Sequence, residues 1–279
     1  MLFEGLFPSL LITFRESLEA VLIVVIMISY LSRMGKGELN RYVYIGAGGA
    51  VVASFVLGLF IQRIYGELEG VSVQLFEGFG SLVAVVVLTY MIFWMTEHSK
   101  KMRGELQERI EVALTTGELF GISILAFVAV FREGLETVFF LTATFFLDPL
   151  GVIVGMVLGS AIILLIAMLL MKGTYHLDIS KFFKYTSVLL IIFAAGLAGY
   201  GTHEIIEAGE GLGIEFGVLS QHAYDINPPI NPDGSYPLLH ERGIIGSILK
   251  ALVGYDGNPE WLRVIVYIGY WLTVGTYIL

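Results

Sequence analysis

One eight-residue pattern occurs twice in this sequence, and each copy lies inside a long apolar segment. Residues 14–21 read FRESLEAV and residues 131–138 read FREGLETV, so six of the eight positions are identical. A charged side chain in the middle of a membrane helix costs roughly 2.5–3.5 kcal/mol on insertion-based scales. The six charged residues are therefore tolerated only where they pair, face a wet cavity or bind an ion. We interpret the two copies as the two halves of one cation site.

The composition places the chain among polytopic membrane proteins. Of its 279 residues, 56% are hydrophobic and only 15% are charged, with a mean hydropathy of +0.81. A soluble domain of this size carries more charge, so we interpret residues 1–279 as a single membrane domain. The absence of cysteine excludes disulfides and thiolate metal sites. The net charge of −9 argues against nucleic acid as a partner, whereas membrane lipid is expected to be one.

Seven apolar segments are long enough, or nearly so, to cross a hydrocarbon core of about 30 Å. The sequence therefore predicts an all-α fold with seven transmembrane helices. No basic region precedes the first segment, which predicts a retained helix and not a cleaved signal. The predicted segments are residues 6–31, 42–62, 78–96, 120–147, 151–171, 183–201 and 262–279.

The charges of the connecting segments predict the orientation. Ten Lys and Arg residues fall on one side of the seven predicted helices and four on the other. Because cytoplasmic loops carry the excess of basic residues, the N-terminus is predicted outside and the C-terminus in the cytoplasm. Most acidic loop residues then lie outside, where they would concentrate cations near an entrance. The alternative for them is an ordinary solvated surface.

The two copies of the pattern also predict an internal repeat. Repeat A covers about residues 1–110, repeat B about 118–205, and each holds three helices. An odd number of helices gives the repeats opposite orientations, as in transporters whose site lies at the membrane midplane. The external segment is predicted at about 202–261, with an apolar run at 244–253 that lies on the membrane or covers a pore mouth. The seventh helix, at about 262–279, follows it.

The chemistry of the repeated pattern is that of a carboxylate cation site. In each copy the arginine and the second glutamate are four residues apart and can pair on one helix face, and the two glutamates are three apart. Carboxylates suit iron, manganese, magnesium and calcium, and guanidinium groups can orient them. The predicted transport site comprises Glu16, Glu19, Glu133 and Glu136, with Arg15 and Arg132 as orienting partners. The structural alternative, two Arg–Glu pairs that lock helix packing, leaves Glu16 and Glu133 without partners.

The doubled Arg-Glu-x-Leu-Glu pattern resembles that of the high-affinity iron permeases, and the resemblance covers nearly the whole chain. It implies iron uptake through the four glutamates, a seven-helix topology with the N-terminus outside, and no prosthetic group. It also implies a partner, either a ferroxidase or an extracytoplasmic iron-binding protein. Further matching features are FEG at 76–78, WM at 94–95 followed by His98, HE at 203–204 with Glu207, and GY at 254–255.

Two residues near the ends of the third predicted helix have two interpretations each. Glu77 would be either an entrance ligand or an acidic residue that a helix N-terminus favours. His98 would be either an exit ligand or a residue that caps the helix end. The aromatic residues near helix ends, which are Tyr42, Tyr44, Trp94, Trp261 and Tyr277, fit an interfacial belt without a role in transport.

The stretch 203–207, HEIIE, departs by one residue from the His-Glu-x-x-His pattern of zinc proteases. Its second histidine is missing, which disfavours a protease. Two interpretations remain: an outer gate or secondary metal site built from His203, Glu204 and Glu207, and ordinary helix-end polarity. In the external segment, His222, Asp225 and His240 are interpreted as solvated loop residues.

The sequence therefore predicts a permease, not an enzyme, that imports iron across the plasma membrane through the doubled pattern. One alternative is a permease for another divalent metal, such as manganese or lead. The other is a membrane-bound carboxylate metalloenzyme, either a protease at 203–207 or a di-iron oxidase. The oxidase is disfavoured because paired Glu-x-x-His motifs are missing from the repeated pattern.

Overall fold

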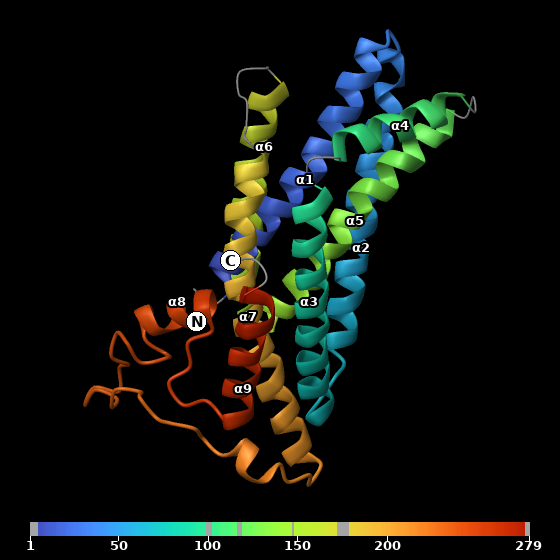
Figure 1. The fold of residues 1–279 in the computed structure, drawn as a ribbon. Helices are drawn as coiled ribbons and strands as arrows, with labels where there is room; N and C mark the ends of the chain where they lie inside the picture. The colour runs from blue at the N-terminus through green and yellow to red at the C-terminus, as the bar shows by residue number, and fades with distance from the viewer. Residues whose placement is uncertain (1–4, 99–101, 116–118, 147, 172–178, 277–279) are drawn as a thin grey trace.

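The computed structural model describes residues 5–98, 102–115, 119–146, 148–171 and 179–276, and these residues fold into a bundle of long helices (Figure 1). Short 3-10 turns at Gly37–Leu39 and Gly217–Ser220 connect helices, and a π turn, Trp271–Gly275, continues the last one. The α-helices are α1 (Leu6–Arg33), α2 (Asn40–Tyr65), α3 (Val71–His98), α4 (Met102–Thr115), α5 (Leu119–Phe145), α6 (Pro149–Met171), α7 (Ile179–Gly211), α8 (Ile244–Val253) and α9 (Trp261–Tyr270).

The all-α prediction is confirmed, and four of the helical segments have both the length and the composition of a membrane span. They are Gly37–Tyr65, Val71–Trp94, Pro149–Met168 and Lys184–Gly211. Helices α1 and α5, with 28 and 27 residues, are also long enough, but each carries the three charged residues of the repeated pattern. The apolar helical segment Trp261–Gly275 is shorter. The protein is thus an integral membrane protein, and α1 and α5 differ from its other long helices in carrying the repeated charged pattern.

The long helices pack in pairs drawn from distant parts of the chain. Helix α1 lies along α6, α2 along α5, and α3 along α7, while α1 and α5 also meet each other. A core of apolar side chains from α1, α3, α5, α6 and α7 surrounds Leu88 and Phe140, which are completely buried. This arrangement brings the two copies of the repeated pattern together in the interior.

Glycines permit the close approach within two of these pairs. A Cβ atom on Gly46 of α2 would lie 2.1 Å from the carbonyl oxygen of Ser123 on α5. A Cβ atom on Gly155 of α6 would lie 2.4 Å from the carbonyl oxygen of Leu6 on α1. Both distances are below van der Waals contact, so any larger residue at either position would force the helices apart.

The sequence does not predict helix α4, because its residues fall in a charged connecting segment between two predicted membrane helices. It is only 14 residues long and carries several charges, so no hydropathy criterion singles it out. Its buried residues Leu106 and Ile110 pack against Met27, Leu31 and other apolar residues of α1, α2 and α5. In Figure 1, α4 crosses α5 near the ends of α1 and α2.

The segment 212–260 gathers beside α7 and α9 at the lower end of the view in Figure 1. Its apolar run, predicted at 244–253, forms α8 over the same residues, and α8 packs against α7. Gly254 ends α8 with a positive φ of 70°, and its Cα atom would lie 2.8 Å from a Cβ atom on Gly196 of α7. An ion pair between Arg263 and Asp256 holds the beginning of α9 to this segment.

Candidate metal centre

The two copies of the repeated pattern lie on facing parts of α1 and α5, deep inside the bundle. Arg15 is completely buried, and Glu16 and Glu19 are each 1% exposed. Glu133 is 2% exposed, whereas the side chain of Glu136 is 16% exposed. Five of the six charges of the repeated pattern are therefore largely buried, whereas the side chain of Arg132 is 43% exposed.

Each arginine pairs with both glutamates of its own copy. Arg15 donates a hydrogen bond of 2.6 Å from Nη1 to Oε1 of Glu16, and its Nη2 lies 3.0 Å from Oε1 of Glu19. In the other copy, the Nη2 of Arg132 lies 2.6 Å from Oε1 of Glu133, and its Nε lies 3.7 Å from Oε1 of Glu136. The shorter contact in each copy is with the adjacent glutamate, which the four-residue spacing rule does not predict.

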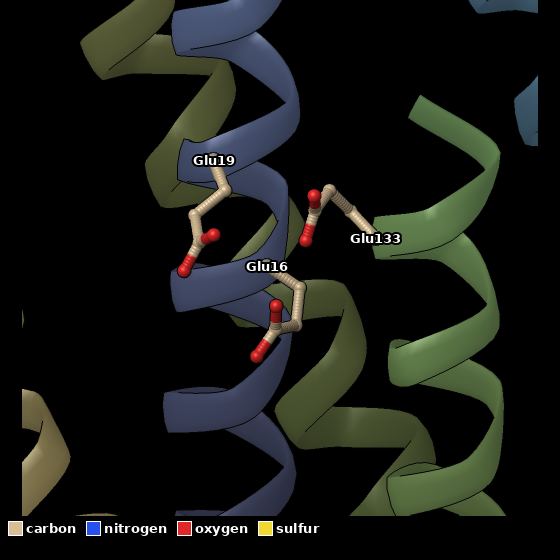
Figure 2. A group of neighbouring side chains, drawn as sticks. All are labelled: Glu16, Glu19 and Glu133. Atoms are coloured by element: carbon tan, nitrogen blue, oxygen red, sulfur yellow. The ribbon is translucent and has the colours of Figure 1, made fainter. Parts of the chain in front are cut away.

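Three carboxylates come together between α1 and α5. Glu16, Glu19 and Glu133 each offer one oxygen, and the three oxygens lie within 4.8 Å of one another. Figure 2 shows Glu133 extending from α5 toward α1, which carries Glu16 and Glu19 about one turn apart. This is the only such group of three or more potential metal ligands within the described part of the chain. We call these three residues the carboxylate cluster.

Several carboxylate oxygen atoms at this site accept no hydrogen bond from the described residues. Oε2 of Glu16, Oε2 of Glu133 and Oε2 of the neighbouring Glu136 are buried and accept no hydrogen bond from the described residues. Buried carboxylate oxygens without donors are costly, and a bound cation removes that cost. The four carboxylates and two guanidinium groups, if ionised, carry a net charge of −2, which a divalent cation neutralises.

Two cavities reach the site from different directions, and they share no lining residue. The first, of about 420 Å³, runs between α1, α2, α5 and α6 from Gln62 and Phe145 to Glu16 and Glu133. The second, of about 160 Å³, is lined by Glu19, Glu136, Arg132 and residues of α3. We call these the large cavity and the small cavity. The carboxylates therefore separate two spaces that are each large enough to hold water molecules.

Two residues of α3 complete the surroundings of the arginines. Arg15 donates a hydrogen bond to Sδ of Met91 at 2.9 Å. The guanidinium carbon of Arg132 lies 4.6 Å from the ring centroid of Trp94. The sequence places Trp94 in an interfacial belt without a role in transport, and the structure adds a contact between its ring and a charged residue of the repeated pattern.

Glu77 is not the N-terminal residue of its helix, so that interpretation is wrong. Helix α3 begins at Val71, six residues earlier, whereas the helix dipole acts mainly on the first turn. Glu77 is 8% exposed and accepts hydrogen bonds of 2.6 Å from the hydroxyls of both Tyr65 and Tyr200. The carboxylate thus joins α2, α3 and α7, a role that the sequence does not indicate.

The stretch 203–207 lies in the last turns of α7, and its side chains contact each other and residues of other segments. The Nδ1 atom of His203 lies 2.7 Å from Oε1 of Glu260, and its Nε2 lies 3.5 Å from Oε1 of Glu207. Gln74 donates a hydrogen bond to Glu207, and Glu204 is buried. Burial alone raises the pKa of the Glu260 carboxyl, but the hydrogen bond and charge of His203 hold that pKa below its ordinary value.

The other histidine and aspartate residues considered from the sequence either contact nearby residues of the same external segment or have side chains that the structure does not describe. His222 Nδ1 contacts the carbonyl oxygen of Asn258, and Asp225 accepts a hydrogen bond from the backbone of Asn227. His240 is 9% exposed, so its interpretation as a solvated residue is wrong. The side chain of His98, at the end of α3, lies outside the described part of the structure.

Comparison with known proteins identifies the family. The Iron permease FTR1 family matches residues 6–279. An uncharacterized protein of Archaeoglobus fulgidus is 41% identical over 94% of this chain and 90% of its own length. The protein named ferrous iron permease EfeU is 37% identical in Yersinia pestis, covering 95% of this chain and 90% of the relative. Its namesake in Escherichia coli O6:H1 is 34% identical, covering 95% and 92%. No solved structure matches significantly. The chain belongs to the Iron permease FTR1 family.

Proposed function

We propose that this protein is a membrane permease that imports iron across the plasma membrane through the carboxylate cluster. The observation that carries the proposal is the buried meeting of Glu16, Glu19 and Glu133 between α1 and α5. Oxygen-rich sites of this kind suit hard or borderline divalent cations. Arg15 and Arg132 orient the carboxylates and limit their repulsion in the unloaded state. Glu136 lies beside the cluster on the small cavity and takes part in the same site.

Seven membrane spans are part of the proposal: α1, α2, α3, α5, α6, α7 and α9 with its π turn. The two groups α1–α3 and α5–α7 would be inverted repeats. The packing pairs support this. If α1, α2 and α3 are exchanged with α5, α6 and α7, in that order, the same set of packing pairs results. The α1–α6 pair becomes α5–α2, and the α3–α7 and α1–α5 pairs become themselves.

The two glycine contacts support the same relation at the level of single residues. A Cβ atom on Gly46 would approach the carbonyl oxygen of Ser123 and the amide nitrogen of Phe127. A Cβ atom on Gly155 would approach the carbonyl oxygen of Leu6 and the amide nitrogen of Leu10. Residues 6 and 123 are 117 positions apart in the sequence, and so are residues 10 and 127. The two copies of the repeated pattern, which begin at residues 14 and 131, have the same separation.

The proposed orientation places the N-terminus outside and the C-terminus in the cytoplasm, as the basic residues of the connecting segments predict. Iron would then come from the acidic outer side. Glu77, His203, Glu204 and Glu207 lie near the outer ends of α3 and α7 and would attract it. Rocking of the repeats against each other would alternate access to the site. A ferroxidase or an extracytoplasmic iron-binding protein is the proposed partner.

The charge of the site and the names of the relatives favour Fe(II) as the transported form. A net charge of −2 is neutralised by one divalent ion, and the relatives in Yersinia pestis and Escherichia coli are named ferrous iron permeases. Manganese also accepts carboxylate ligands and is therefore the competitor to measure. Lead is the second competitor.

Iron uptake into proteoliposomes tests this function. We expect vesicles that contain the protein to accumulate radioactive iron faster than empty vesicles, and Fe(II) to be taken up in preference to Fe(III). Excess manganese or lead is expected to reduce the rate only weakly. Equal or better uptake of manganese would instead identify a permease for another divalent metal, and absence of iron uptake in either oxidation state would contradict the proposal.

A further inference from the structure

The two arginines of the site have equivalent places in the sequence pattern but different surroundings. Arg15 is completely buried, and it contacts Glu16, Glu19 and Met91. Arg132 has a side chain that is 43% exposed, and its guanidinium lies over the ring of Trp94. A completely buried ion pair is held on every side, whereas a half-exposed guanidinium can move into adjacent space. Arg132 is therefore the arginine that can change position without disrupting the core.

The space next to Arg132 is a series of cavities that leads away from the site. The lining of the small cavity includes the carboxylates of Glu19 and Glu136 together with Arg132 and Trp94. A further cavity of about 390 Å³ shares Arg132 and Trp94 with it and is also lined by residues of α5 and by Glu105 and Arg109 of α4. We call this the α4 cavity. Glu105 and Arg109 also line a more open hollow with Glu108 and Val112 on the surface of α4.

We propose that the contact between Arg132 and Trp94 is the gate through which the cation leaves the site toward the α4 side of the membrane. Both residues line the small cavity and the α4 cavity, so their contact forms the partition between the two. Trp94 is a positioning residue: it holds Arg132 across the route, and it does not bind the cation. The inference deepens the proposed function and rests on it.

Charge explains why this partition would respond to the cation. Arg132 is bound on one side by Glu133 and Glu136 and on the other by the π face of Trp94. A divalent cation that enters the cluster competes with Arg132 for the same carboxylate oxygens and repels its positive charge. The guanidinium then loses its carboxylate contacts and can swing on Trp94 toward the α4 cavity. When the cation has left, the freed carboxylates draw Arg132 back.

The absence of cysteine in this chain permits a direct test by single-cysteine labelling. Val87→Cys places a thiol in the small cavity, and Ala129→Cys places one in the α4 cavity. Each variant is treated, in inverted membrane vesicles, with a membrane-impermeant cationic methanethiosulfonate, and the labelling rate is measured. We expect Ala129→Cys to react at least about tenfold faster than Val87→Cys, because only the latter lies behind the partition.

Substitutions at Trp94 then test the gate itself. Trp94→Leu removes the aromatic face and is expected to raise the rate at Val87→Cys at least about tenfold, with little change at Ala129→Cys. Trp94→Phe keeps a weaker aromatic face and is expected to give an intermediate rate. Trp261→Leu replaces an exposed tryptophan at the start of α9 and is expected to change neither rate.

Several results would overturn the inference. Equal labelling rates at Val87→Cys and Ala129→Cys would mean that no partition exists at this contact. The same conclusion would follow if Trp94→Leu left the labelling rate at Val87→Cys unchanged. An equal rise in both rates would mean that the substitution only loosens the fold. Labelling does not require transport, so a failure here is distinct from a failure of the iron uptake assay.

Discussion

Replacing either Glu16 or Glu133 by glutamine is expected to reduce the initial rate of iron uptake roughly 100-fold, since loss of even an outer partner of a metal ligand costs 10–100-fold in affinity or activity. Both residues belong to the carboxylate cluster, and both line the large cavity. Glutamine keeps the size of the side chain but removes the negative charge, so the effect isolates the ligand role. The measurement is uptake of radioactive iron into proteoliposomes with equal amounts of folded protein.

An exposed glutamate provides the matched control for this experiment. Glu67 has a side chain that is 69% exposed, and it pairs with an exposed arginine, Arg63. Glu67→Gln is therefore expected to leave uptake unchanged. Uptake at the wild-type rate by both Glu16→Gln and Glu133→Gln would show that the cluster is not the transport site.

Replacing Arg15 by methionine is expected to destabilise the protein by about 3–5 kcal/mol, because it leaves two carboxylates buried without their counter-charge. A loss of this size corresponds to a decrease of about 10 °C in the midpoint of thermal unfolding. The measurement is the temperature at which detergent-solubilised protein loses its monodisperse peak in size-exclusion chromatography. Arg132→Met is expected to be milder, because the side chain of Arg132 is 43% exposed.

A second substitution separates the charge of Arg15 from its packing. In the double variant Arg15→Met, Glu19→Gln, one of the two uncompensated carboxylates is removed, so we expect part of the lost stability to return. Arg63→Met, at an exposed ion pair, serves as the control and is expected to change the stability by less than about 0.5 kcal/mol. Equal unfolding temperatures for Arg15→Met and wild type would contradict the role assigned to Arg15.

The sequence predicted the helices and singled out the glutamates that the structure brings together, because both depend on strong local signals. Long apolar segments predict helices from composition alone, and charged residues inside them indicate a site on energetic grounds. The predicted glutamates do lie together, except that Glu136 is beside the cluster and not within it. These features needed no knowledge of how the helices pack.

The features that the sequence did not predict depend on contacts between distant segments. Met91 and Trp94 belong to an uncharged part of α3, and only the packing of α3 on α1 and α5 brings them to the arginines. The partners of Glu77, Tyr65 and Tyr200, come from two other helices. Helix α4 was missed because its short, charged sequence resembles a loop, and tertiary packing stabilises such a helix.

X-ray absorption at the iron edge of purified, iron-loaded protein, combined with the measured amount of iron per chain, tests whether the carboxylate cluster binds the transported ion. We expect one iron per chain with oxygen ligands only, and loss of this iron in Glu133→Gln. A different result would be iron that has nitrogen ligands and remains bound in Glu133→Gln. The ion would then lie elsewhere, and His203 would be the first residue to test. This result would contradict the assignment of the carboxylate cluster as the transport site.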